Sequence, residues 1–240
     1  MSFHAQISHF FKQHQIQLQA WSVQNELFFD ETLGILIWLF DPQNSAHVKD
    51  LEFIRSQALF DGLRLIVLPL DFWVNKQELV QDRLLSLWKK SKRILAKNCV
   101  LDRVDIDTAD AFLERNHFFG TCAAKHRIGL YSKNGYLQAI ATFGKPRLMT
   151  YDEQYYSHEW LRYASLSNTT IIGGMGKLLQ AFLLETKAVH VMTYADMNWG
   201  SGKSFEKLGF KKQAIKSNLG ENLGASMKYI LDLRAPSHEF

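Results

Sequence analysis

The sequence has little of what disulfide bonding, disorder or membrane insertion requires. Its 240 residues include two cysteines, four prolines and 14 glycines. Cys99 and Cys122 stand 23 positions apart, which fits neither a zinc-site spacing nor a disulfide framework. No apolar run approaches the roughly 20 residues of a membrane span, and the first residues lack the charged start and apolar stretch of a signal peptide. We therefore expect a cytoplasmic protein with no membrane partner.

The composition is that of an ordinary globular protein, long enough for one large domain or two small ones. Hydrophobic residues make up 47% of the chain and charged residues 22%. The formal net charge is +4. This mild excess of positive charge permits contact with the phosphates of a nucleic acid or of a nucleotide cofactor, and it requires neither.

The first part of the chain alternates apolar strands with amphipathic helices. The basic stretch KKSKRILAK (89–97) follows them and is either a domain joint or the solvated end of a helix. The elements expected before it are a helix at 2–14, strands at 27–29 and 35–40 around a turn, a helix at 49–61 ended by Gly62, a strand at 63–70 and a helix at 75–89.

The rest of the chain predicts a mixed α/β sheet. Thr108 is expected to cap a helix that Gly120 ends, and Asn134-Gly135 is the turn signal of a hairpin. The further expected elements are a strand at 99–106, the hairpin at 126–144, a strand at 159–166, a strand end, glycine turn and helix at 171–187, a strand at 189–196, a short helix at 201–210 and a strand at 226–233.

A glycine-rich turn between a strand and an amphipathic helix is the sharpest local feature. Gly173, Gly174 and Gly176 let the backbone approach a ligand, and the helix N-terminus that follows offers unpaired N–H groups. The turn suits a pyrophosphate; the alternative is a tight turn that binds no ligand. Leu178 follows Lys177 where a Walker loop needs Ser or Thr, which disfavours a nucleoside triphosphatase.

Together with Asn198 and the run FEKLGF (205–210), this turn resembles the Gcn5-related acyltransferase family. The resemblance covers the chain from about residue 97. It implies a splayed central sheet, acetyl-coenzyme A as cofactor and a small-molecule or macromolecular amine as acyl acceptor. The thioester would enter between the strands at 159–166 and 189–196, with Asn198 near the pantetheine arm. The residues implied to hold the coenzyme are Ile172, Gly173, Gly174, Met175, Gly176, Lys177 and Asn198.

The same resemblance implies catalytic roles. Glu159 matches the carboxylate that deprotonates the attacking amine; the alternative is an exposed glutamate at a strand start. Phe205 stands where the family usually has a tyrosine that protonates the leaving thiolate. Tyr194 or Tyr163 would then substitute, or the protein binds the coenzyme without turnover. His117 is a candidate base or simply finishes its helix.

A second resemblance covers more of the chain. The stretches at 97–122, 128–147, 159–182 and 194–210 are similar to phage and bacterial proteins related to homing endonucleases, in which a nuclease-like domain of the very-short-patch-repair type precedes an acyltransferase-like domain. The segment GLRLIVLPLDFWVNKQELVQDRLLSLW (62–88) resembles the last strand and helix of that nuclease domain. Trp38 stands where a nuclease carboxylate is expected, with Asp30, Asp41 and Asp71 nearby. The resemblance therefore implies a degenerate nuclease that lacks a metal-binding set.

These observations predict two domains. Residues 1–92 would form a small α/β domain with a degenerate restriction-endonuclease-like fold, and residues 97–240 an α/β domain of the acyltransferase type. The predicted function is acyl-coenzyme A dependent N-acyl transfer. The alternative is a DNA-associated protein whose second half modifies a base or does not catalyse. Arg162, on an apolar strand, would bind a substrate phosphate or pair with an acid. Nothing in the sequence indicates an oligomeric state.

Overall fold

The chain forms two compact units, and each is described by itself. The computed structural model describes residues 2–22, 27–150, 154–216 and 226–234. Within these residues, the first unit comprises the chain up to Gln77, a returning segment, Asp196–Gly202, and Ser226. The second unit contains Glu78–Ala195, Lys203–Lys216 and the described residues from Met227 onwards. Across the described residues, no helix has both the length and the apolar content that crossing a bilayer would need.

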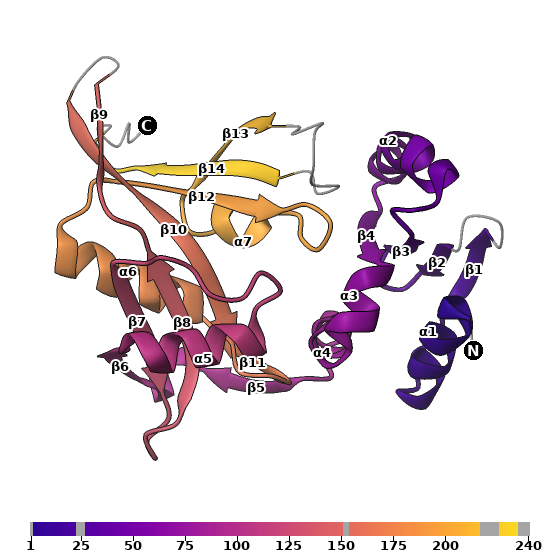
Figure 1. Ribbon diagram of the computed structural model, residues 1–240, viewed down its shortest axis with the longest axis horizontal. Coiled ribbons are helices and arrows are strands. Elements are labelled where there is room, and N and C mark those ends of the chain that lie inside the picture. Colours follow the sequence, from indigo (N-terminus) through magenta and orange to yellow (C-terminus); the bar gives the residue numbers. More distant parts are fainter. Residues whose placement is uncertain (1, 23–26, 151–153, 217–225, 235–240) are drawn as a thin grey trace. The chain divides into compact units, whose positions relative to one another are not determined.

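The first unit is a four-stranded sheet with three helices, counted over its described residues (Figure 1). The strands follow the order β1-β2-β3-β4, antiparallel except for the parallel pair β3 and β4. The elements are α1 (Phe3–Gln13), β1 (Gln19–Ser22), β2 (Leu27–Asp30), β3 (Ile35–Phe40), α2 (Ser45–Phe60), β4 (Arg64–Pro69) and α3 (Leu70–Asn75).

The core of the first unit explains why β3 is apolar throughout. All six β3 residues are buried, and Trp38 is 0% exposed between α2 and the neighbouring strands. Asp30 accepts a hydrogen bond from the Leu33 N–H at 2.9 Å, and Asp41 accepts one from the Gln43 N–H at 2.9 Å. Both carboxylates therefore stabilise turns, and the nuclease-like role of this unit stays a prediction.

The second unit is built on a mixed sheet whose strands follow the order β13-β14-β12-β10-β8-β7-β6, with β9 on β10, among the described residues. A separate parallel pair joins β11 and β5. The elements are α4 (Gln77–Leu87), β5 (Lys92–Leu95), a 3₁₀ turn (Ala96–Asn98), β6 (Val100–Arg103), α5 (Ile106–Asn116), β7 (His126–Tyr131), β8 (Leu137–Phe143), β9 (Arg147–Met149), β10 (Tyr155–Ser165), β11 (Thr169–Ile172), α6 (Gly174–Thr186), β12 (His190–Asp196), α7 (Lys203–Glu206), β13 (Lys211–Lys216) and β14 (Ser226–Asp232).

Helices α5 and α6 cover opposite faces of this sheet. The ring of Phe182 on α6 stacks on Phe143 of β8 with centroids 3.8 Å apart. The buried side of α5 packs instead on Ile140 of β8 and Ala164 of β10. Phe143 and Ile140 are three residues apart on one strand, so their side chains point to opposite sides. We call these sides the α5 face and the α6 face.

Two local predictions need correction. The stretch 89–97 is not a joint, because β5 within it pairs in parallel with β11 in the second unit. The lysine side chains of this stretch are exposed while the backbone of β5 pairs with β11. A high density of charge is therefore compatible with a strand and does not identify a linker. Asp105, not Thr108, caps α5: its carboxylate accepts the Thr108 N–H at 2.8 Å. The predicted mixed α/β sheet is confirmed.

Buried histidines make the second unit sensitive to acid. Burial lowers the pKa of His158 and of His190 from the ordinary 6.5, since it disfavours the charged ring. In the unfolded chain these rings take up protons first as the pH falls, so their contribution to stability is present above pH 6.5 and is lost below it.

We expect the free energy of unfolding to be lower at pH 5.5 than at pH 7.5, because unfolding then releases buried imidazoles to accept protons. His158→Phe, which keeps a ring against Phe182, should reduce that difference. His9→Phe, at an exposed position, is the matched control and should retain it. Urea denaturation at the two pH values measures the effect; equal pH differences in both variants would contradict it.

Candidate functional site

Strands β10 and β12 separate part-way along their length. Their parallel pairing runs from His158 opposite Val191 to Trp160 opposite Thr193 and stops there. Beyond that point β10 continues to Ser165 beside β8, whereas β12 continues to its own end without β10 (Figure 1). The predicted splay of these two strands is therefore confirmed.

The glycine turn starts α6 with free backbone donors. Gly173 is the N-cap with a φ of 77°, a value that side chains rarely allow. The first backbone bond of the helix runs from the Lys177 N–H to the Gly173 carbonyl at 3.0 Å. The N–H groups before it have no partner within the helix. This end of α6 can therefore donate several hydrogen bonds to an anion.

Packing is tight around Gly174 and close around Gly176. A Cβ on Gly174 would lie 2.9 Å from the Tyr163 hydroxyl and 2.9 Å from Ile171 Cγ2. A Cβ on Gly176 would lie 3.3 Å from Leu208 Cδ2. These glycines thus let α6 approach β10 and the segment after α7, in addition to exposing backbone amides.

A pocket of about 660 Å³ lies against this turn. One wall is the start of α6, including Gln180 one turn further on, and the other is the end of β5 with the 3₁₀ turn after it. Lys97 is exposed and brings a positive charge to the rim. The lining residues are Leu95, Ala96, Lys97, Ile172, Gly173, Gly176, Lys177 and Gln180.

The sequence analysis did not predict that the basic stretch 89–97 forms the second wall of this pocket, because the stretch was interpreted as a domain joint or a helix end. Its lysines, Lys97 among them, could have indicated a phosphate site, since positive charge also gathers at such sites. Of the residues implied to hold the coenzyme, Ile172, Gly173, Gly176 and Lys177 line the pocket, and Gly174 and Met175 lie between them in the first turn of α6.

The ammonium group of Lys177 is held by the protein itself. Its Nζ donates to the carbonyl of Ala96 at 3.0 Å and to that of Cys99 at 2.6 Å. These bonds tie α6 to the opposite wall of the pocket. Lys177 therefore fixes the pocket's shape and adds positive charge at its base, rather than reaching out as a flexible phosphate ligand.

Glu159 and Tyr194 lie on the α5 face of the sheet. Glu159 is opposite Met192 in the register, and side chains directly opposite each other share a face. Tyr194 is two residues beyond Met192 on β12, so it points to that face too. Glu159 is half-buried and Tyr194 is 39% exposed. The structure thus brings a carboxylate and a phenol to one side of the splay.

His117 has a structural role that the sequence left open. It follows the last residue of α5, and its Nδ1 accepts the Phe119 N–H at 3.1 Å. The neutral ring therefore carries its proton on Nε2 and offers a donor there, not a base. This bond shapes the loop after α5, in agreement with the alternative that His117 finishes the helix.

Phe205 stands in a cluster of aromatic rings. Its ring centroid lies 5.7 Å from Trp160, 5.6 Å from Phe210 and 5.7 Å from Tyr229. Burial raises the pKa of Tyr163 to about 12, so its hydroxyl stays protonated and is a poor acid. Tyr163 also points to the α6 face, because it lies opposite Ala141 while Arg162 lies opposite Thr142. Of the two tyrosines considered as acids, Tyr194 shares a face with Glu159.

Asn198 belongs to the first unit, within the returning segment. Its Oδ1 accepts a hydrogen bond from Arg55 at 2.6 Å, and its carbonyl accepts the Val67 N–H at 3.0 Å. Arg64 donates to the neighbouring carbonyl of Trp199 at 2.9 Å. The side-chain oxygen of Asn198 is therefore engaged within the first unit, and the predicted contact with the pantetheine arm stays a prediction.

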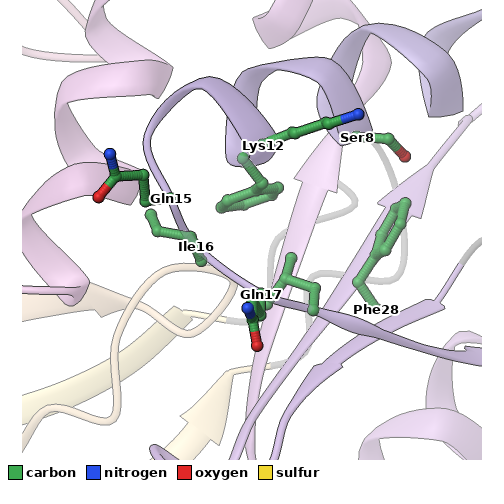
Figure 2. Close-up of a pocket in the computed structure, with 8 residues that line it drawn as sticks. Ser8, Lys12, Gln15, Ile16, Gln17 and Phe28 are labelled. Atoms are coloured by element: carbon green, nitrogen blue, oxygen red, sulfur yellow. The ribbon is translucent and has the colours of Figure 1, made fainter.

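The first unit has a pocket of its own, of about 440 Å³ (Figure 2). Phe11, Ile16 and Phe28 form its buried apolar part, and Lys12 supplies a charge. Figure 2 shows Ser8 and Lys12 on α1 and Phe28 on the strand across from it. The residues that line this pocket are Ser8, Phe11, Lys12, Gln15, Ile16, Gln17, Leu18 and Phe28.

No group of three or more His, Cys, Asp or Glu side chains in the described residues could hold a metal ion.

Comparison with known proteins gives structural likenesses only. No family model and no curated protein matches the chain. An N-acetyltransferase from Staphylococcus aureus Mu50 is 20% identical with a TM-score of 0.44, over 57% of this chain and 99% of that one. A GNAT family N-acetyltransferase from Escherichia coli, solved with CoA, is 14% identical with a TM-score of 0.40, over 56% and 82%. The NatC complex bound to Gag peptide and CoA contains a chain that is 14% identical with a TM-score of 0.44, over 57% of this chain and 99% of that one. Likenesses of this size concern architecture and not chemistry.

Lys177→Met keeps the aliphatic stem and removes the ammonium group that bridges the two pocket walls. We expect it to destabilise the protein by about 1–3 kcal/mol, because two charge-assisted hydrogen bonds are lost. Lys97→Met, on the exposed rim of the same pocket, removes the same charge and should leave stability unchanged. Urea denaturation followed by circular dichroism compares the two. Equal effects would show that the bonds of Lys177 to Ala96 and Cys99 do not matter for stability.

Proposed function

We propose that the second unit binds an acyl-coenzyme A and transfers its acyl group to an amine. The observation that carries the proposal is the pocket at the start of α6, where free backbone donors, the charge of Lys97 and room of about 660 Å³ coincide. The resemblance of the glycine turn and the FEKLGF run to Gcn5-related acyltransferases supports the same assignment. The likeness to solved acetyltransferases agrees with it.

The splay gives the bound thioester a path to the acceptor. Past Trp160 and Thr193 the two parallel strands no longer pair, so an acyl-pantetheine arm can pass between them from the pocket. A thioester supplies an activated acyl group. The acceptor amine would approach on the α5 face, where Glu159 and Tyr194 lie.

Glu159 would take the proton of the attacking amine as its nitrogen bonds to the thioester carbonyl carbon. The carbon–sulfur bond then breaks, and the sulfur leaves as a thiolate that needs a proton. Tyr194 is placed to supply it directly or through water. This assignment replaces the usual tyrosine of the family, whose place Phe205 takes. The alternative of a DNA-associated protein stays a prediction that rests on the second resemblance and on the net charge of +4.

The coenzyme site is tested by calorimetric titration with acetyl-coenzyme A. Wild type should bind saturably. Gln180→Glu changes the pocket lining by one charge without changing its size and should weaken binding about two- to fivefold, since one like charge near a solvated phosphate costs roughly 0.5–1 kcal/mol.

Gln17→Glu makes the same change in the pocket of the first unit and should have no effect. Equal affinities of the two variants would exclude the pocket at α6 as the coenzyme site. A wild-type protein that does not bind acetyl-coenzyme A would overturn the proposed function.

The base is tested separately with Glu159→Gln. The side chain keeps its size and loses its ability to accept a proton, so turnover should fall about 100-fold or more while binding of acetyl-coenzyme A stays unchanged. Glu185→Gln, which alters a carboxylate on α6 that pairs with Arg103, serves as the matched control. Turnover is measured as release of free coenzyme A by chromatography, and undiminished release by Glu159→Gln removes it from the mechanism.

A further inference from the structure

Arg162 is a half-buried cation without an acidic partner in the described part of the chain. It lies on β10 opposite Thr142, on the α5 face. Its Nη1 donates to the carbonyl of Leu161 at 2.9 Å. Its Nε is buried and has no hydrogen-bond partner, and no carboxylate of the described residues forms an ion pair with it.

Two acids linked to β10 do not pair with Arg162. Asp82 on α4 accepts the hydroxyl of Ser167 and the N–H of Asn168, both in the turn that follows β10. Glu159 shares the α5 face and forms no ion pair with Arg162. The sequence left open whether Arg162 pairs with an acid, and the described residues provide none.

A buried guanidinium N–H without an acceptor is costly, because burial removes its water partner as well. Arginine cannot relieve this cost by losing its proton. The buried Nε–H itself is out of a ligand's reach, so a ligand oxyanion would bind the outer N–H groups of the same guanidinium and balance its charge. Guanidinium groups bind carboxylates and phosphates through two parallel N–H donors, so the ligand chemistry that fits is an oxyanion.

The loop after α5 places an aromatic ring beside this cation. The guanidinium carbon of Arg162 lies 5.8 Å from the centroid of Phe119, whose side chain is 55% exposed. His117 holds the Phe119 N–H, and Gly120 turns the chain with a φ of 57°. Cys122 then contacts Thr142 on the sheet at 3.2 Å between Sγ and Oγ1. The loop is therefore fixed at both ends over the α5 face.

A bulge in β10 puts Arg162 on the same face as the proposed base. In a regular strand, residues three apart point to opposite sides. The register between β10 and β8 shifts between Trp160 and Arg162, so that Glu159 and Arg162 share the α5 face. A ligand bound by Arg162 would lie on the side where the acceptor amine meets Glu159.

We propose that Arg162 binds an anionic group of the acyl acceptor, so that the acceptor is an amine that also carries a carboxylate or a phosphate. This inference rests on the proposed function and specifies its substrate class. Phe119 shields the pair from water on one side, which strengthens a charge-assisted hydrogen bond. Glu159 takes the proton of the amine while Arg162 holds the anionic end of the same molecule.

The experiment measures acylation of matched amines by the full chain with acetyl-coenzyme A. Tyrosine and tyramine differ by a carboxylate, and O-phosphoethanolamine and ethanolamine differ by a phosphate. Wild type should prefer the anionic member of at least one pair, and the favoured pair identifies the anion. Arg162→Gln should lose about 10- to 100-fold in kcat/KM for that member, the range of a lost hydrogen bond to a charged group, and little for its neutral partner.

Arg162→Lys keeps the charge and loses the paired donors, so it should restore part of the preference. Arg115→Gln, at an exposed position on α5, makes the same charge change and should leave the preference intact. Equal rates within both pairs, or acylation of none of the four amines by a protein that binds acetyl-coenzyme A, would overturn the inference and leave the coenzyme site standing. Failure to bind acetyl-coenzyme A would instead overturn the proposed function beneath it.

Discussion

The bulge of β10 at Leu161 decides what the second unit can present on each side of its sheet. It is held by side chains: the Trp160 indole donates across it to the Arg162 carbonyl at 2.9 Å, and Thr193 donates to the Trp160 carbonyl at 2.9 Å. The first bond spans the bulge, and the second occupies the Trp160 carbonyl at the last paired position of β10 and β12. The change of side-chain direction and the splay therefore arise at one place.

The two faces that result have different characters. On the α6 face the side chains are mainly apolar and aromatic, as in the stack of Phe182 on Phe143, and they form the core. On the α5 face, past the end of α5, the sheet carries Glu159 and Arg162 beneath an aromatic loop. Burial of the first face stabilises the unit, which allows the second face to retain polar groups that a core would exclude.

Periodicity predicted most of the elements, because core-facing residues leave a regular pattern. The hairpin around Asn134-Gly135 formed as expected, with β7 and β8 in antiparallel register, and the glycine turn does precede a helix. Short segments stabilised by backbone pairing left no such pattern: β5 has exposed side chains on most positions, and β9 has three residues. Their existence depends on distant strands that a local window cannot contain.

The site was predictable where it depends on backbone and unpredictable where it depends on long-range contacts. Gly173 and Gly176, which line the pocket, could be predicted because a glycine turn depends only on neighbouring residues. The engagement of Lys177 by Ala96 and Cys99 joins residues about 80 positions apart, so the sequence showed a charge but not its partners. The face on which Arg162 lies depends on the bulge in β10, and no residue type in that strand predicts a bulge.

The returning segment Asp196–Gly202 has a consequence for the order of folding. Its contacts with Arg55, Arg64 and Val67 mean that the first unit is not continuous in the chain. During synthesis, residues 1–77 emerge first but lack these partners until more than a hundred further residues have left the ribosome. Until β12 of the other unit has been made, β4 therefore lacks the bond from the Val67 N–H to the Asn198 carbonyl, and Arg55 and Arg64 lack the acceptors that they bind in the folded chain. The first unit is completed only after most of the second has been synthesised.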